Sequence, residues 1–544
     1  MTPEPGFRAG RVLTALAIGI VIASLGLWAQ NTALVGVNYD DAIYALLARA
    51  VADGHGYRLT ELGDLPGIKY PPIYPMSLVP LWVLTDSQDA ALHAMKLANG
   101  LYIGVAAGLF AFFLVELSIL SLPLVAGVSM IGFASGSMML VSSGLLSEPL
   151  YLVLLYLALW KADSARARCG TVCLLSVGML AGLVALTRMA GITLVAAVII
   201  GTGYRYGRRS AAITAATSVL MLLPWLLFTF LGAREIPDVL IPRYGSYIQL
   251  YLASISGSPV AALETMAVNL GAILQTLGSM LIPQAGALIQ STVGSALIGL
   301  AALGSWRIFS AAPATAVYPW LYLSLISVWT FPPFRFVFIL FPLLFALAVV
   351  ACVSLARLSV AGPEIDPAVL ARRRRLRLGM LALGVLLIAN MAYRQSRALS
   401  NRVWDGAQLR KSAVGAEVVG WVTANTGPQS VIAFELDPLV ALYSGRTAVP
   451  NNYEPIHSWY RSAATEVEPL ARLLREMEAD YLAVRPNVPA AAEPIDRLID
   501  RYPESLKLIH VTPGGVLIFE VRRAELAREA TALKTQGEEI SDVP

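Results

Sequence analysis

Long apolar runs recur along this chain of 544 residues and are separated by short polar loops. A helix needs about 20 apolar residues to cross the hydrocarbon core of a bilayer. Runs of this kind lie near residues 12–27, 97–115, 122–140, 150–160, 172–186, 192–204, 211–231, 287–303, 317–330, 336–355 and 378–392. With 57% hydrophobic and 14% charged residues, the chain could not hide its apolar surface in water. We therefore predict a polytopic α-helical membrane protein with about 11 transmembrane helices, or roughly 10 to 13 because several runs are short or interrupted.

The loops between these runs alternate in charge. Basic residues gather in loops 161–168, 205–209 and 357–377 and at Arg307, whereas most acids lie in loops 31–92, 142–148, 232–269 and 331–335. The positive-inside rule places the basic loops and the N-terminus in the cytoplasm. The acidic loops, and everything after about Arg394, are then extracytoplasmic, in a multi-pass protein of the cell inner or plasma membrane. No small-residue cleavage site follows the first run, so we interpret it as a retained span and not as a signal peptide.

Three segments divide the chain. Residues 1–395 form the transmembrane module, and residues 396–526 have the composition of a soluble α/β domain. The charged segment 527–544 is predicted to be disordered. All three cysteines lie in or near the cytoplasmic half, so we expect no disulfide framework in the extracytoplasmic domain. A net charge of +4 with no basic stripe gives no indication of a nucleic-acid partner.

The first outer loop, residues 31–92, opens with an amphipathic pattern. Its apolar spacing predicts a helix over 39–53, which Asn38 caps and Gly54 ends in a left-handed turn. A later apolar run that ends at Leu84 is too short to cross a bilayer. We expect that run, together with the helix over 39–53, to lie at the membrane interface.

Acidic residues on the outer face are the first candidates for chemistry. Asp40 and Asp41 fall in the first turn of the predicted helix, where the dipole stabilises carboxylates. One of them could be a general base, and the alternative is a pair of solvated first-turn acids. Glu148 begins a span, where an unpaired carboxylate costs roughly 2.5–3.5 kcal/mol. That penalty favours a polar cavity around Glu148, although a simple helix-start carboxylate is the alternative.

Cationic residues on the same face are the second group. Lys69 sits in a Lys-Tyr-Pro-Pro segment, and Arg188 and Arg335 lie at outer turns of spans. Arginines that converge from separate turns would clamp a phosphate by bidentate bonding. Snorkelling at the interface is the alternative for each of them. Arg243 and Tyr244 are weaker candidates of the same kind. Together with the acids, these residues predict a site that handles a phosphorylated lipid and needs a base.

Several segments resemble a known family. The chain is similar to the C-superfamily of integral membrane glycosyltransferases, and in particular to the bacterial branch of protein O-mannosyltransferases, lipid A aminoarabinose transferases and galacturonosyltransferases. The resemblance rests on residues 39–44, 54–57, 69–75, 147–149, 187–188, 334–342 and 442–446, in that order. Members of this family move a sugar from a polyprenyl-phosphate donor to an acceptor on the outer face, with inversion.

The resemblance implies roles for the two aspartates, Lys69, Arg335 and Glu148, and we predict that the other candidates belong to the same site. Asp40 and Asp41 would be catalytic, with Asp40 as the base or acceptor-orienting residue; Asp41 stands where the family usually has Glu, which leaves the division of labour open. The donor phosphate would bind Lys69, Arg335, Arg188 and Arg243. The substrate cavity would contain Glu148, Tyr44, Tyr70, Tyr74, His55 and Tyr244. The acceptor would be a lipid, glycan or protein, and membrane lipids surround the spans.

Cofactors and rival functions stay open at this point. No metal ligand set is assigned, although some relatives bind a divalent metal ion near the acids and His55 is close in sequence. The main alternative is a transporter or flippase for lipid-linked sugars, which would need charges near mid-bilayer and an internal repeat. The sequence shows neither clearly. A third reading, a membrane scaffold that displays the outer domain, gives Asp40, Lys69 and Arg335 no purpose.

Overall fold

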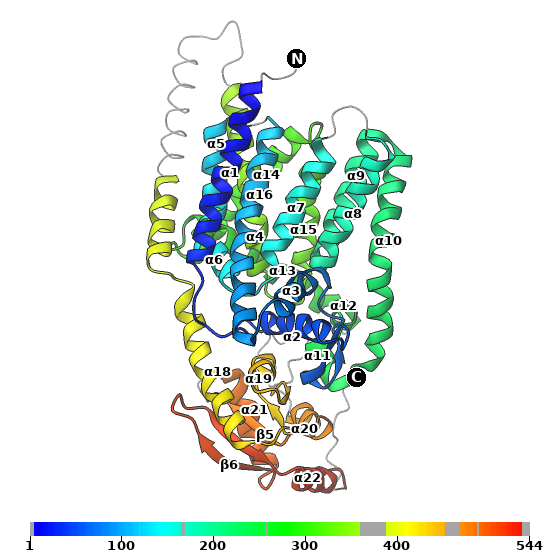
Figure 1. The fold of residues 1–544 in the computed structure, drawn as a ribbon, viewed down its shortest axis with the longest axis vertical. Coiled ribbons are helices and arrows are strands. Elements are labelled where there is room, and N and C mark those ends of the chain that lie inside the picture. Colours follow the sequence, from blue (N-terminus) through cyan, green and yellow to red (C-terminus); the bar gives the residue numbers. More distant parts are fainter. Residues whose placement is uncertain are drawn as a thin grey trace, which may run out of the picture.

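The computed structural model consists of a long helical bundle with a small α/β domain at one end (Figure 1). It describes residues 5–118, 120–164, 169–256, 259–358, 388–451, 467–486 and 489–535. The bundle helices are α1 (Pro5–Trp28), α4 (Gln88–Glu116), α5 (Leu122–Phe133), α6 (Gly136–Ser143), α7 (Glu148–Ser164), α8 (Thr171–Thr187), α9 (Ile192–Tyr206), α10 (Arg208–Gly232), α13 (Pro259–Leu281), α14 (Ala287–Ile308), α15 (Pro313–Ser327) and α16 (Phe334–Leu358). We call the end of the bundle next to the α/β domain the outer end.

Six helices in the described residues are long and apolar enough to cross a membrane, which agrees with a multi-pass membrane protein. They are Gly10–Trp28, Gln88–Glu116, Met189–Tyr206, Arg208–Glu235, Ala287–Ile308 and Phe334–Ala356. The run predicted at 122–140 is instead a pair of helices, α5 and α6, bent by 58°. The runs at 150–160, 172–186 and 317–330 form α7, α8 and α15, which stand in the same bundle but are shorter (Figure 1). The run at 378–392 lies mostly outside the described residues, so the count of 11 stays a prediction.

Close packing of small residues holds α1 against α4. A Cβ added at Gly104 would stand 2.4 Å from the Cβ of Ala23, and one at Gly26 would stand 2.6 Å from the carbonyl oxygen of Gly100. Inside a bilayer, helices associate mainly through such close backbone approach, because lipid is as apolar as their side chains. The first span is therefore built to pack along α4 as part of the bundle.

Short elements cover the outer end of the bundle. They are α2 (Asp40–Ala52), β1 (Arg58–Leu59), η1 (Thr60–Leu62), β2 (Leu65–Pro66), α3 (Ile73–Val83), η2 (Met189–Gly191), η3 (Ala233–Glu235), η4 (Asp238–Leu240), α11 (Ile241–Tyr244) and α12 (Tyr247–Ser256). Both helices expected in the first outer loop are thus present, as α2 and α3. Asn38 does not cap α2: the N-cap position is Tyr39, with a φ of 67° and no side-chain cap. Gly54 has a φ of +80° after α2 ends, as expected.

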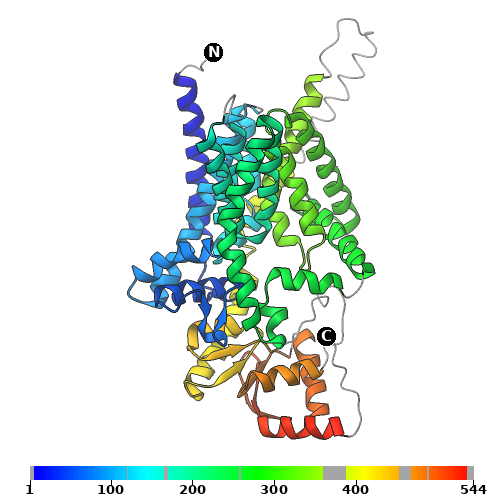
Figure 2. The ribbon, with the colours of Figure 1, turned by 90° about the vertical axis from the view of Figure 1, so that its right-hand side faces the viewer.

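The α/β domain contains a five-stranded sheet in the order β4-β3-β5-β7-β6. Strand β3 pairs in parallel with β4 and β5, whereas β7 pairs antiparallel with β5 and β6. Its elements are α18 (Asp405–Asn425), β3 (Val431–Ala433), α19 (Asp437–Ser444), β4 (Thr447–Val449), α20 (Val467–Glu476), β5 (Tyr481–Val484), α21 (Pro489–Arg501), β6 (Leu506–Val511), β7 (Leu517–Val521) and α22 (Arg523–Thr535). Helix α22 covers 527–535 of the segment expected to be disordered, and the remainder lies outside the described residues. Figure 2 shows this domain beneath the outer end of the bundle.

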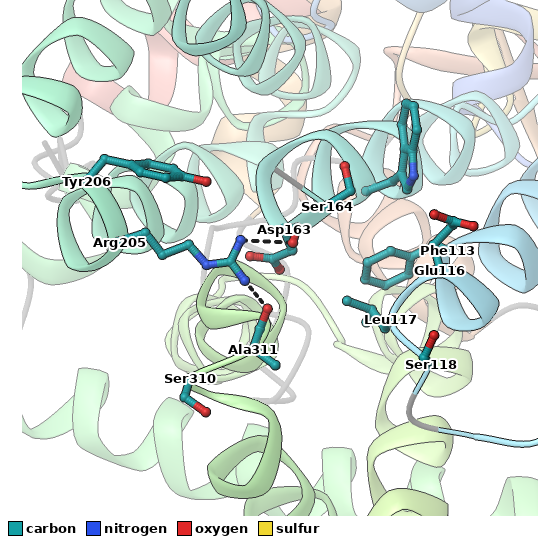
Figure 3. Close-up of a pocket in the computed structure, with 11 residues that line it drawn as sticks. Phe113, Glu116, Leu117, Ser118, Asp163, Ser164, Arg205, Tyr206, Ser310 and Ala311 are labelled. Carbon is teal, nitrogen blue, oxygen red and sulfur yellow. Dashed lines mark hydrogen bonds between the residues drawn. The ribbon is translucent and has the colours of Figure 1, made fainter. Parts of the chain in front are cut away.

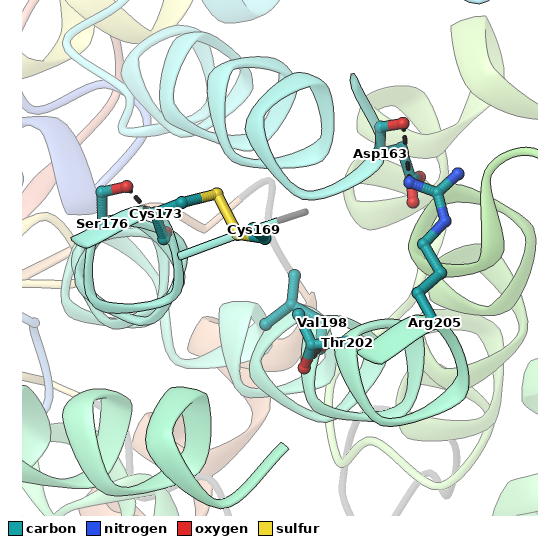
Figure 4. The surroundings of a disulfide bond; sticks show 7 residues. All are labelled: Asp163, Cys169, Cys173, Ser176, Val198, Thr202 and Arg205. Carbon is teal, nitrogen blue, oxygen red and sulfur yellow. Dashed lines mark hydrogen bonds between the residues drawn. A yellow bond between two sulfur atoms is a disulfide. The ribbon is translucent and has the colours of Figure 1, made fainter. Parts of the chain in front are cut away.

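One disulfide joins Cys169 to Cys173 at the start of α8 (Figure 4). It lies at the opposite end of the bundle from the α/β domain, in the part of the chain predicted to be cytoplasmic. The sequence did not predict this pair, although a spacing of 4 brings two side chains onto one face of a helical turn. Cys352 is a free thiol.

Candidate functional site

A cavity of ≈ 640 Å³ lies between the outer end of the bundle and the α/β domain. It brings together side chains that are far apart in the sequence. Seven of the predicted site residues line it, namely Asp40, Tyr44, Lys69, Tyr70, Arg188, Arg243 and Arg335. The predicted acids and cations from the first outer loop and from later spans therefore do converge on one space.

Asp40, the first residue of α2, carries the carboxylate that lines the cavity. Arg335 Nη2 donates to Asp40 Oδ2 at 2.6 Å, and the Tyr70 hydroxyl donates to Asp40 Oδ1 at 3.1 Å. Burial alone would raise the pKa of Asp40, but Arg335, Lys69 and Arg188 outweigh it and lower the pKa below the ordinary value. Asp40 is therefore ionised at neutral pH. Its two oxygens have about four acceptor sites between them, so they can also accept from a substrate hydroxyl.

Glu148 lies behind the cavity wall and holds two arginines. Its carboxylate is 0% exposed and pairs with Arg188 Nη1 at 2.9 Å and with Arg335 Nε at 2.8 Å. Arg188 Nη1 also donates to Ser147 Oγ at 2.8 Å, and the Tyr44 hydroxyl shares a hydrogen bond with the same oxygen at 3.1 Å. Pairing offsets part of the cost of a buried carboxylate and fixes the directions in which both guanidinium groups point. Glu148 thus supports the site from behind.

Lys69 enters the cavity from the segment between β2 and α3. Its side-chain nitrogen donates to the backbone carbonyl of Arg243 at 2.7 Å and lies 5.2 Å from the ring centroid of Phe331 and 5.9 Å from that of Tyr247. Lys69 is 8% exposed. Rings around an ammonium stabilise it without supplying a counter-charge, so these surroundings suit a cation that binds an anionic ligand.

Arg243 and its neighbours join the cavity to the α/β domain. Its guanidinium lies 3.9 Å from the ring centroid of Tyr39, and Nη2 donates to the backbone carbonyl of Glu435 at 3.2 Å. Glu435 is also paired with Arg485, and both of these side chains line the cavity. The α/β domain therefore forms part of the cavity wall.

Five predicted site residues do not line the cavity. The carboxylate of Asp41 is 1% exposed and accepts hydrogen bonds from the backbone nitrogen of Asn38, the side chain of Asn38 and the backbone nitrogen of Ala42. Burial, with the charge of Asp40, raises the pKa of Asp41 to about 6. Asp41 thus holds the turn before α2 and does not line the cavity, so a catalytic role for it stays a prediction. The others are Glu148, described above, and Tyr74, His55 and Tyr244.

The last three of these have different surroundings. Tyr74 is fully buried and donates to Asn99 Oδ1 at 3.2 Å, so it is part of the core. His55 is exposed beyond the far end of α2, about 20 Å along that helix from Asp40 at 1.5 Å per residue. Tyr244 is buried against the α/β domain.

The residues around the cavity do not fit a metal ion. Within the described residues, no three His, Cys, Asp or Glu side chains converge in a way that could hold one. Asp40 and Glu148 are both engaged with arginines, and His55 lies away from them. We therefore derive no step of the chemistry through a metal.

Sequence reasoning missed several cavity residues. Tyr247 and Phe331 flank Lys69, and Glu435, Arg485 and Gln408 come from the α/β domain. Tyr247 and Phe331 lie within predicted outer loops, so their aromatic character was a usable signal. The domain residues gave none, because nothing in their local pattern indicates that this part of the sheet domain faces the membrane module.

A second cavity, of ≈ 470 Å³, lies at the far end of the bundle (Figure 3). Asp163 is its most conspicuous acid, but that carboxylate accepts from the backbone nitrogens of Ala314 and Thr315 at 3.3 and 2.8 Å. It also accepts from the Thr315 hydroxyl at 2.6 Å. Arg205 donates to the backbone carbonyls of Asp163 and Ala311. These groups cap the start of α15 and join helix ends, which explains them structurally.

Two solved structures share the fold. The chain is similar to a crystal structure of ArnT from Cupriavidus metallidurans bound to undecaprenyl phosphate, with a TM-score of 0.52 and 13% identity over 94% of this chain and 98% of that one. ArnT in the apo state gives a TM-score of 0.51 and 12% identity over 95% and 99% of the two chains. Neither a family model nor a curated protein matches the sequence. The predicted resemblance to C-superfamily glycosyltransferases is thus confirmed at the level of the fold.

Proposed function

We propose that this protein is a membrane glycosyltransferase that moves a sugar from a polyprenyl-phosphate donor to an acceptor hydroxyl at the extracytoplasmic face. The observation that carries the proposal is the meeting of one ionised carboxylate, Asp40, with Lys69 and Arg335 in one cavity at the outer end of the spans. The similarity of the whole chain to a fold solved with undecaprenyl phosphate supports the donor class. The donor would reach the cavity through the bilayer, so no nucleotide-binding fold is required.

The reaction follows from the chemistry of these groups. The acceptor oxygen attacks the anomeric carbon from the face opposite the phosphate, a new carbon–oxygen bond forms, and the bond from that carbon to the phosphate oxygen breaks. Asp40 takes the proton from the acceptor hydroxyl as the bond forms. The electron pair leaves on the lipid phosphate, whose growing charge Lys69 and Arg335 stabilise. The configuration at the anomeric carbon is inverted.

The low pKa of Asp40 limits how it can act. No carboxylate is basic enough to remove the proton from a ground-state alcohol, and the pairing with Arg335 lowers the pKa of Asp40 further. An attacking hydroxyl becomes strongly acidic once its bond to carbon is partly made. Asp40 would therefore orient the hydroxyl first and accept its proton late.

The location of the cavity favours this reaction over transport. A transporter binds its substrate near the bilayer midplane between repeats and then exposes the site to the other side. The cavity here is instead bounded by α2, the 239–250 segment and the α/β domain, at the outer end of the bundle. Such a site suits a lipid-borne donor that meets an acceptor from outside.

The test uses purified protein, a panel of polyprenyl-phosphate sugars, and mass spectrometry of the released polyprenyl phosphate and of the glycosylated acceptor. We expect release with at least one donor, and a loss of about 10²–10⁴-fold in Asp40→Asn. Asp53→Asn, which changes an exposed acid after the same helix, should behave as wild type. Equal rates in wild type and Asp40→Asn would reject the assignment of the base.

A further inference from the structure

One buried carboxylate of the α/β domain reaches the candidate site through two tyrosines. Asp437 begins α19 and is 0% exposed. Its Oδ2 accepts a hydrogen bond from the Tyr244 hydroxyl and lies 3.5 Å from the Tyr39 hydroxyl, which also donates to the Tyr244 oxygen at 3.0 Å. Burial raises the pKa of Asp437 to about 6 and the nearby Arg243 opposes that rise, so the group is ionised at neutral pH. These three side chains form a cluster that we call the tyrosine clamp.

The first arm of the clamp acts on Asp40. Tyr39 precedes Asp40 directly and has a φ of 67°, a left-handed conformation that a bulky residue rarely adopts. Such a conformation persists only when the surroundings hold it. The hydroxyl of Tyr39 is held by the clamp and its ring by the guanidinium of Arg243, 3.9 Å from the ring centroid. The direction in which Asp40 leaves the backbone thus depends on this arm.

The second arm acts on Lys69. Tyr244 follows Arg243, whose backbone carbonyl accepts the hydrogen bond from Lys69 at 2.7 Å. Both residues lie in α11, a single turn of only 4 residues that has little stability of its own. A hydrogen bond from Tyr244 to a fixed carboxylate anchors that turn. The position of the lysine ammonium thus depends on this arm.

We propose that Asp437 is a positioning residue that aligns Asp40 with Lys69, so that docking of the α/β domain completes the active site. The proposal rests on the proposed function, because it assigns Asp40 to the acceptor and Lys69 to the donor phosphate. These residues come from separate segments of the outer loop, and one carboxylate ties both to the same domain. Misplacement of reacting groups by even 1 Å can cost a transferase about 10²-fold in rate.

Docking of the domain does not depend on Asp437 alone, which makes the proposal testable. Helix α19 also contacts the first outer loop through Tyr443. The hydroxyl oxygen of Tyr443 accepts a hydrogen bond from the backbone nitrogen of Val35 at 3.0 Å. Leu439 of the same helix packs against Gly36, because a Cβ added at Gly36 would stand only 2.5 Å from the Cβ of Leu439. A variant that lacks only the carboxylate should therefore keep the domain in place while it releases both tyrosines.

The experiment compares Tyr39→Phe, Tyr244→Phe and Asp437→Asn in the full-length protein. Tyr39→Phe should lower kcat about tenfold with an unchanged donor KM, because only Asp40 shifts. Tyr244→Phe should raise the donor KM, and the Kd for undecaprenyl phosphate, about tenfold. Its loss of kcat should be smaller than that of Tyr39→Phe, because the Tyr39 hydroxyl loses one acceptor but keeps Asp437 Oδ2 at 3.5 Å. Asp437→Asn should show both effects.

The matched control is Asp480→Asn in the same domain. Its carboxylate accepts from the backbone nitrogen of Val431 at 3.0 Å and pairs with Arg523 at 3.0 Å, away from the cavity. This variant should lower the Tm and leave kcat, KM and Kd unchanged.

Two kinds of result separate the proposals. If the clamp variants lose kcat and affinity in the same proportion, in step with their Tm, or change neither, the positioning role is overturned. If the wild type transfers no sugar from any donor, the proposed function fails. In that case the binding measurement still tests whether Asp437 positions Lys69. Tyr244→Phe should weaken binding of undecaprenyl phosphate, and Tyr39→Phe should not.

Discussion

At the scale of single residues, the site depends on how charges are paired. Arg335 contacts both Asp40 and Glu148, so it joins the carboxylate that lines the cavity to the one buried behind it. Glu148 in turn has Arg188 as its second partner. Lys69 also lines the cavity, where its ammonium donates to the backbone carbonyl of Arg243 and lies near the rings of Tyr247 and Phe331. We therefore expect the affinity for the donor to depend on Lys69.

Replacement of Lys69 tests that dependence. Lys69→Met keeps the length of the side chain and removes its charge, so the Kd for undecaprenyl phosphate should rise about tenfold or more, equivalent to about 1.4 kcal/mol. The measurement is a binding titration in detergent. Lys507→Met, on an exposed strand of the α/β domain, is the control and should bind as wild type. Unchanged affinity in Lys69→Met would remove it from the donor site.

The buried pairing of Glu148 predicts a stability effect. Glu148→Gln leaves two arginines without their shared counter-charge, which should lower the free energy of unfolding by on the order of 3 kcal/mol. Glu61→Gln is the matched control, because Glu61 pairs with Arg49 at 2.6 Å but is 24% exposed. An exposed pair contributes about 0–1 kcal/mol. Thermal unfolding in detergent compares the two, and an equal fall in Tm would contradict the bridging role.

Asp41 predicts a dependence of stability on pH. Its pKa is raised from 3.8 to about 6, so the folded protein binds this proton more tightly than the unfolded chain does. Between those two pH values the free energy of unfolding therefore falls as pH rises. Relative to Asp41→Asn, the wild type should gain on the order of 1 kcal/mol when pH falls from 7 to 5. A wild-type-to-variant difference in Tm that does not change with pH would contradict this.

The sequence could predict most of the charged residues of the site but not that Asp40 lines the cavity while Asp41 does not. Neighbouring residues in a helix point about 100° apart, so only one of the two could face a cavity. Which one depends on how α2 packs, and that is set by contacts with distant segments. Tyr70 was predicted and does contact Asp40, whereas Tyr247 came from a loop with no comparable motif.

At the scale of elements, hydropathy located most bundle helices and missed α13. This helix, Pro259–Leu281, begins inside the segment 232–269, which was assigned to a loop, and continues past its end. It was missed because polar residues interrupt its apolar run. Asn269 is one of them, and its side chain donates to the carbonyls of Ser327 and Trp329 at 3.1 and 2.8 Å inside the bundle. A hydropathy sum treats such a residue as exposed, although its hydrogen bonds make burial acceptable.

The packing of α1 on α4 predicts a strong response to a larger side chain. The side chain of Gly104→Val would clash with Ala23 and push α1 away from α4. This should lower the free energy of unfolding by about 1–3 kcal/mol. Gly127→Val in α5 is the control, because nothing lies within 4 Å of its added Cβ. The readout is Tm in detergent, and equal Tm values for the two variants would argue against close helix contact.

At the scale of the whole molecule, the α/β domain acts as one wall of the candidate site. The composition of residues 396–526 predicted its α/β class but not how its elements meet the bundle. Helix α19 is the element that meets the outer loop, and it was missed because its 8 residues are too few to show a helical period. Contacts such as Tyr39 with Asp437 join residues about 400 positions apart, which no local pattern encodes.

Docking of this domain predicts the effect of a substitution at Gly36. Gly36→Val places a side chain against Leu439 and at a φ of +116°, so it should lower both the Tm and the transfer rate. Gly207→Val is the matched control: its φ is +87°, but nothing lies within 4 Å. Both variants bear a backbone cost of about 1–2 kcal/mol. Only Gly36→Val should lose activity beyond its loss of folded protein, and equal specific activity in the two would contradict docking at this point.

The central claim is that the outer cavity seats the donor phosphate beside Asp40. The most direct measurement is a cryo-electron microscopy structure of the protein in lipid nanodiscs with undecaprenyl phosphate added. We predict density for the phosphate within hydrogen-bonding distance of Lys69 and next to Arg335, with the chain leaving between the spans into the bilayer. Phosphate density at the opposite cavity beside Arg205, or an outer cavity without the lipid at saturating concentration, would contradict the claim.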